Sequence, residues 1–192
     1  MSYDITLNDP VTGEAIWLSE PHFMRGGTYQ MGGSTVLWLN ITYNYAPYYY
    51  EATDGDPRFA HDEVSCWYSD GTHGPIKTEY GIRGIYGKTG ADSIPMLEDM
   101  ISRIEEKYKP NGEWITTEWE KTVMYDLLGN EVADPIRQIR SGSPYKEKTI
   151  VVNVSEGETG NYWAATAANA IRPLYQLIAF AKMRPDGVWD GD

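Results

Sequence analysis

Residues 93–108 read SIPMLEDMISRIEEKY, and their pattern is the clearest structural signal in the chain. Apolar side chains recur there at intervals of three and four residues, while most charged side chains fall between them; the apolar positions are Ile94, Leu97, Ile101, Ile104 and Tyr108. This spacing places the apolar groups on one face of a helix. The sequence therefore predicts an amphipathic helix over about 93–109, capped by Asp92 or Ser93.

A second helix is predicted near the end of the chain, over about 166–183. Ile171, Leu174, Ile178 and Ala181 repeat the spacing of three and four residues. Pro173 lies inside this segment, lacks an amide donor and crowds the preceding turn, so we expect it to kink or split the helix. The tail that follows is short and acidic, and Trp189 is its one large apolar side chain.

Strand patterns occupy much of the remaining chain. They predict a hairpin over 3–18, a largely buried strand over 35–43, a second hairpin over 64–80 and strands within 113–126 and 148–154, with a short helical turn over 135–140. No internal repeat and no long linker is visible. We therefore expect a single α+β domain over 1–192, built mainly on antiparallel sheet.

The charge of the chain restricts its partners. Its 192 residues include 28 acidic and 16 basic side chains, which gives a formal net charge of -12. This charge repels phosphate backbones and anionic lipids, so we expect no direct nucleic-acid binding and no membrane association. Cys66 is the only cysteine, so no intramolecular disulfide forms, and we expect a cytoplasmic protein.

The segment 81–90, GIRGIYGKTG, is one candidate site. It places glycines, Arg83, Lys88 and Thr89 just before the first predicted helix, where backbone amides and the helix dipole favour an anion. Gly87-Lys88-Thr89 is similar to part of a phosphate loop, but Ile82 stands where that motif requires its first glycine. Two interpretations stay open, an anion site and a purely structural connection.

A second glycine-rich loop surrounds Arg25 and offers another cation. Tyr29 in that loop, together with Tyr45 and Tyr86, provides rings that can stack on a base or a sugar. A surface hairpin loop is the alternative interpretation. The full candidate ligand-binding set is Arg25, Tyr29, Tyr45, Arg83, Tyr86, Gly87, Lys88 and Thr89.

No catalytic or metal-binding pattern stands out. His61, Cys66 and His73 are the only zinc candidates, and their spacing matches none of the usual ligand pairs. The chain also lacks the strand, turn and helix signature of a nucleophile elbow. We expect no cofactor, no metal and no catalytic residues.

Several sequence blocks resemble a family of small acidic proteins encoded by bacteriophages and prophages. The blocks are HFMRGGTY at 22–29, LNITYNY at 39–45, GIRGIYGKTGA at 81–91 and PDGVWDGD at 185–192, together with shorter ones at 3–5, 9–12 and 161–163. The resemblance covers about half of the chain. It implies that 52–80 and 110–150 are insertions in this member, and it transfers no established activity.

These observations lead to three functional hypotheses. The first is a non-catalytic phage accessory protein that counters host immunity in the host cytoplasm by binding and sequestering a phosphate-bearing nucleotide signal. The second is an inhibitor of a host defence protein, similar to an anti-CRISPR protein or a nucleic-acid mimic, with an acidic and tyrosine-rich face made of Tyr48, Tyr49, Tyr50, Glu51, Asp54 and Asp56. The third is a phage structural or assembly protein. The ring-rich surface also suggests a homodimer.

Overall fold

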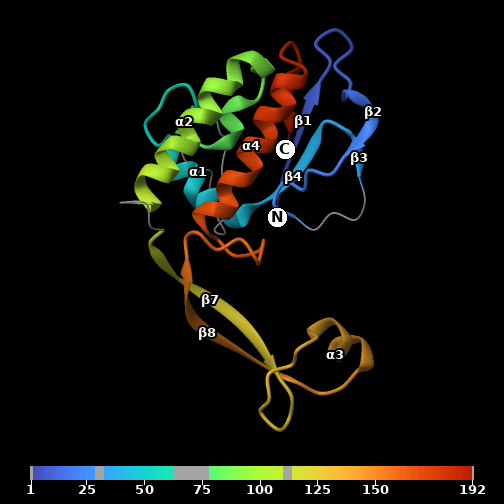
Figure 1. Ribbon diagram of the computed structural model, residues 1–192, viewed down its shortest axis with the longest axis vertical. Helices are drawn as coiled ribbons and strands as arrows, with labels where there is room; N and C mark the ends of the chain where they lie inside the picture. Colours follow the sequence, from blue (N-terminus) through green and yellow to red (C-terminus); the bar gives the residue numbers. More distant parts are fainter. Residues whose placement is uncertain (1, 29–32, 63–77, 110–113, 192) are drawn as a thin grey trace, which may run out of the picture. The chain divides into compact units, whose positions relative to one another are not determined.

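A computed structural model describes residues 2–28, 33–62, 78–109 and 114–191. It confirms the predicted α+β class, because helices are combined with small sheets whose strand pairs are all antiparallel (Figure 1). Two units make up the chain: unit 1 contains 1–115 and 156–192, and unit 2 contains 116–155. Each unit is described separately below.

The central sheet of unit 1 joins strands from both ends of the chain. β1 (Ser2–Asn8) pairs on one side with β4 (Trp38–Thr42) and on the other with β9 (Val188–Gly191). Alternate residues of β1 are fully buried, as expected for a strand with one face on the core: Tyr3, Ile5 and Leu7. The acidic tail is therefore part of the fold, and Trp189 in β9 is buried.

Three helices pack together in unit 1 (Figure 1): α1 (Ala46–Thr53), α2 (Gly90–Tyr108) and α4 (Ala167–Met183). The predicted helices are confirmed as α2 and α4. α2 begins a little earlier than predicted, at Gly90, because the Thr89 side chain accepts a hydrogen bond from the Asp92 amide. α4 continues through Pro173 as one helix, so of the two predicted outcomes, a kink or a split, the split does not occur.

The predicted hairpin over 3–18 is only partly formed. Asn8 bridges Ala15 and the Ile16 amide donates to the Leu7 carbonyl, but β2 (Trp17–His22) pairs with β3 (Ser34–Val36) instead of β1. A short pair, β5 (His61–Asp62) with β6 (Thr78–Glu79), flanks a stretch outside the described residues. The hairpin predicted over 64–80 lies almost entirely in that stretch. Two 3-10 turns, η1 (Tyr43–Tyr45) and η2 (Ile82–Ile85), complete unit 1.

Unit 2 is a long β-hairpin with a short helix between its strands. β7 (Thr116–Tyr125) pairs along its whole length with β8 (Lys146–Ser155), which confirms the two predicted strands. α3 (Pro135–Ser141) confirms the predicted helical turn, with Asp134 accepting from the Arg137 amide at 3.0 Å. Within the described chain, no helix combines the length and apolar character needed to cross a membrane.

Candidate functional site

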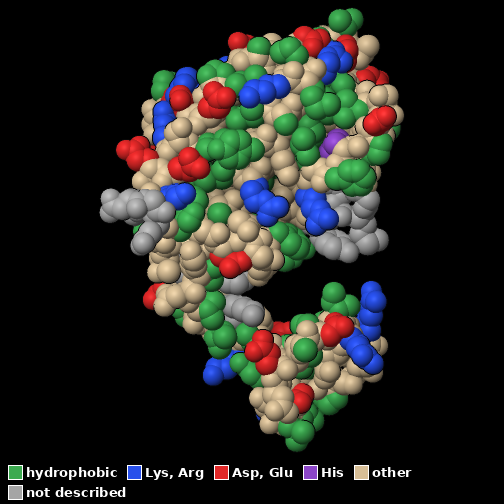
Figure 2. All heavy atoms as spheres, viewed as in Figure 1, with side chains coloured by type: hydrophobic (Ala, Val, Ile, Leu, Met, Phe, Trp, Pro, Cys, Tyr) green, Lys and Arg blue, Asp and Glu red, His purple; other side chains and the backbone are tan. Residues whose placement is uncertain are grey.

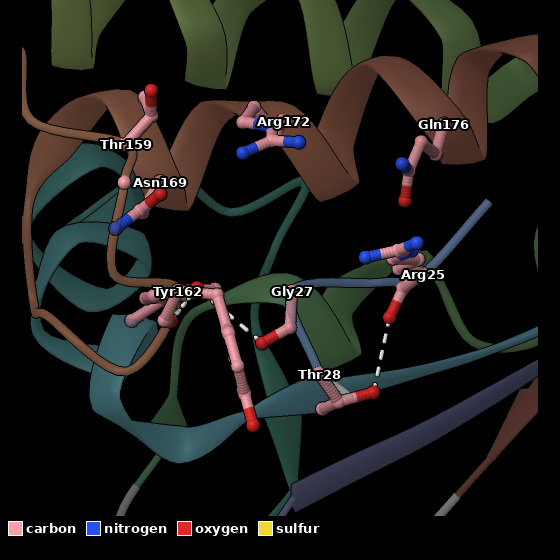
Figure 3. Close-up of a pocket in the computed structure, with 10 residues that line it drawn as sticks. Arg25, Gly27, Thr28, Thr159, Tyr162, Asn169, Arg172 and Gln176 are labelled. Carbon is pink, nitrogen blue, oxygen red and sulfur yellow. Dashed lines mark hydrogen bonds between the residues drawn. The ribbon is translucent and has the colours of Figure 1, made fainter. Parts of the chain in front are cut away.

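A polar cavity of about 230 Å³ lies within unit 1, between a glycine-rich loop, α4 and the segment that precedes α4 (Figure 3). Loop residues on one side of it are Arg25, Gly27 and Thr28, and Tyr45 contributes from η1. The remaining lining residues are Thr159, Gly160, Tyr162, Asn169, Arg172 and Gln176. The cavity therefore brings together segments from both ends of the chain.

Two glycines fix the position of the loop that carries Arg25. Gly26 has a φ of 59°, and a Cβ there would lie 2.4 Å from the Asn40 carbonyl oxygen. Gly27 has a φ of 81°, and its Cβ would lie 2.4 Å from the ring of Tyr45. Both positions thus need the left-handed backbone and the close approach that glycine permits. The Gly26 amide also donates to Gln176 Oε1 at 2.8 Å, which ties the loop to α4.

One face of α4 supplies the opposite wall. Asn169, Arg172 and Gln176 follow one another at intervals of three and four residues, which places their side chains on the same face of the helix. Figure 3 shows the Gln176 side chain pointing from α4 toward Arg25, while the Arg172 guanidinium lies beside α4. Two guanidinium groups from distant parts of the sequence therefore line one cavity.

The charge of the cavity wall differs from that of the whole chain. Its ten lining residues include two arginines and no aspartate or glutamate, although the chain carries a net charge of -12. Within the described ranges, neither Arg25 nor Arg172 has an ion-pair partner. On the face shown in Figure 2, some basic side chains lie near one another low on unit 1, while acidic and basic side chains are mixed over its upper part. The cavity is thus a local positive region on an acidic protein.

Neutral donors accompany the two arginines. Burial raises the pKa of Tyr45 to about 12, with Arg172 acting in the opposite direction, so the phenol is protonated at neutral pH. Its hydroxyl donates to the Tyr162 carbonyl and holds the segment before α4 in place. Asn169 Nδ2 is also used, by the carbonyls of Asn161 and Ala164. In contrast, Gln176 Nε2 has no partner within the described part of the chain and can meet a ligand.

An aromatic ring of the cavity wall packs against a second aromatic ring. Tyr162 lines it and packs against Trp163, with ring centroids 4.9 Å apart and an interplanar angle of 37°. Trp163 is 49% exposed, so part of its ring faces solvent. Exposed rings beside a cationic cavity can stack on a nucleobase.

The other predicted anion site, residues 81–90, has a different environment. The Gly87 amide donates to the Trp189 carbonyl at 2.8 Å, and the Gly90 amide donates to the Gly187 carbonyl at 2.7 Å. The Ala91 amide donates to the Pro185 carbonyl at 2.9 Å, and the Lys88 amide is bonded within the loop. The backbone donors that were expected to meet an anion therefore hold the C-terminal segment. These contacts favour the structural interpretation of the segment.

Side chains of the same segment are also engaged. Thr89 caps α2, and its hydroxyl contacts the Asp92 carboxylate at 2.7 Å. The Arg83 guanidinium donates to the Tyr43 hydroxyl and lies 5.3 Å from the ring centroid of Tyr3. Tyr86 is half-buried and faces Gly191, and Lys88 is exposed. Arg83, Tyr86, Gly87, Lys88 and Thr89 are not among the residues that line the cavity with Arg25 and Tyr45.

The proposed acidic and tyrosine-rich face is divided by the fold. Tyr48 and Tyr49 are buried, and their hydroxyls donate to Glu156 and to the Ala170 carbonyl respectively. The Asp56 carboxylate pairs with Arg58 and Arg103, and Arg58 is the main cause of its strongly lowered pKa. Tyr50, Glu51 and Asp54 are exposed, and Glu51 pairs with Lys107. Two of the six side chains are thus core residues rather than surface anchors.

Not all of the residues named from the sequence fall within the described ranges. Tyr29, Cys66 and His73 lie outside the described residues. Within the described part, no group of three His, Cys, Asp or Glu side chains is arranged to hold a metal ion.

The α4 side of the cavity was not predicted from the sequence. Asn169, Arg172 and Gln176 recur at helical spacing in a largely apolar helix, and that polar stripe was a signal for a second functional face. Thr159, Gly160 and Tyr162 had no such signal, because only the fold brings their segment beside Arg25.

Comparison of the chain with protein-family models, with curated proteins and with solved structures gives no match. The resemblance to phage proteins stays a prediction.

Proposed function

We propose that unit 1 is a non-catalytic binding protein that holds a phosphate-bearing nucleotide in the cavity between Arg25 and Arg172. The observation that supports this most is the presence of two arginines and no carboxylate in the cavity wall of a strongly acidic chain. Guanidinium groups form charge-assisted, often bidentate hydrogen bonds with phosphate. The phosphate would lie between the two arginines.

The size of the cavity indicates how the rest of the ligand binds. A volume of about 230 Å³ is below the roughly 300–1,000 Å³ typical of pockets for drug-sized ligands. It suits a phosphate with its ribose, while the base extends to the edge. There Tyr162 and Trp163 offer a stacking surface. Gln176 Nε2 would add a neutral donor to the phosphate or the sugar.

The biological role proposed for this binding is sequestration of a nucleotide signal of host immunity in the infected cell. It rests on the resemblance of the sequence blocks to phage proteins. Because sequestration needs tight binding and no turnover, the nucleotide should be recovered unchanged from its complex with the protein.

Calorimetric titration with AMP, adenosine and ribose 5-phosphate tests the binding proposal. We expect AMP and ribose 5-phosphate to bind and adenosine to bind much more weakly. Arg25→Ala and Arg172→Ala should each weaken AMP binding about tenfold to a hundredfold, because a hydrogen bond to a charged group contributes about 1.5–3 kcal/mol. Arg172→Lys should bind less well than the native protein, because lysine lacks the planar fork.

Lys182→Ala is the matched control, because it removes an exposed cation from the same helix α4 outside the cavity. Its affinity for AMP should equal that of the native protein. Equal loss in Lys182→Ala and Arg172→Ala would mean that only net charge matters. Unchanged affinity in both arginine variants would refute the proposed site.

A further inference from the structure

The two long strands of unit 2 form a two-stranded sheet, and the one further β-bridge to them among the described residues joins Tyr125 of β7 to Glu131. They pair from Thr116 opposite Ser155 to Tyr125 opposite Lys146. Val123 and Met124 are the buried hydrophobic residues of this unit in the described chain. A two-stranded hairpin is marginally stable in water, and further strands or a packed helix are needed for independent stability. An additional strand partner would therefore stabilise unit 2.

The outer edges of the two strands differ in their charge. β7 carries the exposed residues Glu118 and Glu120 in its middle, and charged side chains are a common protection of edge strands. β8 has charges only at its start, from Lys146 to Lys148, and is uncharged from Thr149 to Val154. That uncharged segment is rich in β-branched residues, which favour strand pairing. The edge of β8 is the less protected of the two.

Val151 lies near the middle of this edge and is 61% exposed. In the register of the hairpin it stands opposite Glu120, while Asn153 stands opposite Glu118 and Thr149 opposite Thr122. Val151 is thus an apolar, β-branched side chain on the polar face of the sheet. A second valine opposite it would remove it from water.

We propose that unit 2 pairs with unit 2 of a second copy of this chain through the edge of β8, antiparallel and with the two-fold axis at Val151. The product is a four-stranded sheet. A strand edge that is complementary to itself forms the isologous contact of a two-fold dimer. The surface is separate from the nucleotide cavity, so the two proposals stand or fall independently.

The charge pattern of β8 favours the antiparallel direction. With the axis at Val151, Ile150 faces Val152 of the second copy and Lys148 faces Val154. The charged start of each strand then lies beside the uncharged end of the other. A parallel pairing in register would place Lys146, Glu147 and Lys148 beside their own copies, and like charges directly opposite are destabilising.

Light scattering after size exclusion, over a series of protein concentrations, tests this dimer with three full-length variants. The native protein should be a dimer. Val151→Lys and Val151→Glu should each be monomers, because the two-fold axis places like charges opposite each other. An equimolar mixture of these two variants should form a dimer again, because opposite charges now meet.

Thr122→Lys is the matched control, because Thr122 is an exposed residue on the same face but on β7. It should leave the dimer unchanged. Circular dichroism should show that the Val151 variants are folded, as expected for a residue that is largely exposed. A native protein that is monomeric at all concentrations, a dimer that persists in Val151→Lys, or a mixture that stays monomeric would overturn the proposal.

Discussion

Two glycine-rich loops of unit 1, the Arg25 loop and residues 81–90, differ in what their polar groups contact. In the segment 81–90, backbone amides donate to carbonyls of the C-terminal segment, and Thr89 caps α2. In the Arg25 loop, glycines pack against β4 and Tyr45, while the guanidinium lines a cavity. The difference lies in the side chains, because backbone amides of both loops donate to the protein, whereas only the Arg25 guanidinium lines a cavity. A cation in a glycine-rich loop is thus a better candidate for ligand binding where its charged group lines a cavity.

The largest expected loss of stability comes from removing the buried side chain of Trp189, in the tail that contacts residues 81–90. Trp189 is buried, and its Nε1 donates to the Ser93 hydroxyl at 2.7 Å. Trp189→Ala should lower the free energy of unfolding by about 3–5 kcal/mol, as expected for a large buried side chain. Urea unfolding measures this loss. Trp163→Ala, at a half-exposed tryptophan, should cost far less, and equal losses would contradict the structural role of the tail.

A glycine substitution in each loop gives the next largest effect. Gly26→Ala should cost about 2–4 kcal/mol, because strain at positive φ adds to a clash with the Asn40 backbone. Gly87→Ala should cost only about 1 kcal/mol, because φ is 74° but no atom lies within 4 Å of the new Cβ. Thermal unfolding of both variants tests this order. A larger loss for Gly87→Ala would show that the Arg25 loop is not packed as described.

The smallest expected effect is a loss of stability at low pH through the Arg184–Asp186 ion pair. Arg184 pairs with Asp186 at 2.8 Å, and this hydrogen-bonded pair lowers the pKa of the Asp186 carboxyl below its usual 3.8. A carboxyl whose pKa is lowered by folding stabilises the fold above its unfolded-state pKa, and this contribution is lost as the pH falls through the folded-state pKa. The native protein should therefore lose stability from about pH 5 downward. Asp186→Asn should show a smaller fall.

Urea midpoints at a series of pH values measure this difference. Asp54→Asn is a suitable control, because Asp54 is exposed and has no ion-pair partner within the described chain. Identical acid profiles for Asp186→Asn and the native protein would show that the pair contributes nothing, as is common for exposed ion pairs.

Periodicity predicted the helices because their apolar faces are regular. It also predicted the strands of unit 2, whose pairing partners are close in the sequence. α2 and α4 carry apolar residues at helical spacing, and β7 and β8 carry β-branched runs. The pairing of β1 could not be predicted in this way. Its partners are β4 and β9, and the second of these lies at the far end of the chain. Only the packed fold selects such distant strands.

Only part of the candidate site could be predicted, because its residues also come from distant parts of the chain. Arg25 and Tyr45 were named from the sequence and line the cavity, whereas Arg172 was not named. Arg83 was named as an anion-binding residue because of its charge, but its guanidinium lies beside the rings of Tyr3 and Tyr43. Whether a charged side chain faces a cavity depends on tertiary contacts, which residue types alone do not specify.

NMR spectra of the backbone amides, recorded during a titration with AMP, test most directly the claim that a nucleotide binds in the cavity beside Arg25. They report on both glycine-rich loops at once. Binding in the cavity predicts shifts at Gly26, Gly27, Thr28 and residues 159–162, with Gly87 to Ala91 unchanged. Shifts at Gly87 to Ala91 with an unaffected Arg25 loop would place the anion at the other loop and contradict the account.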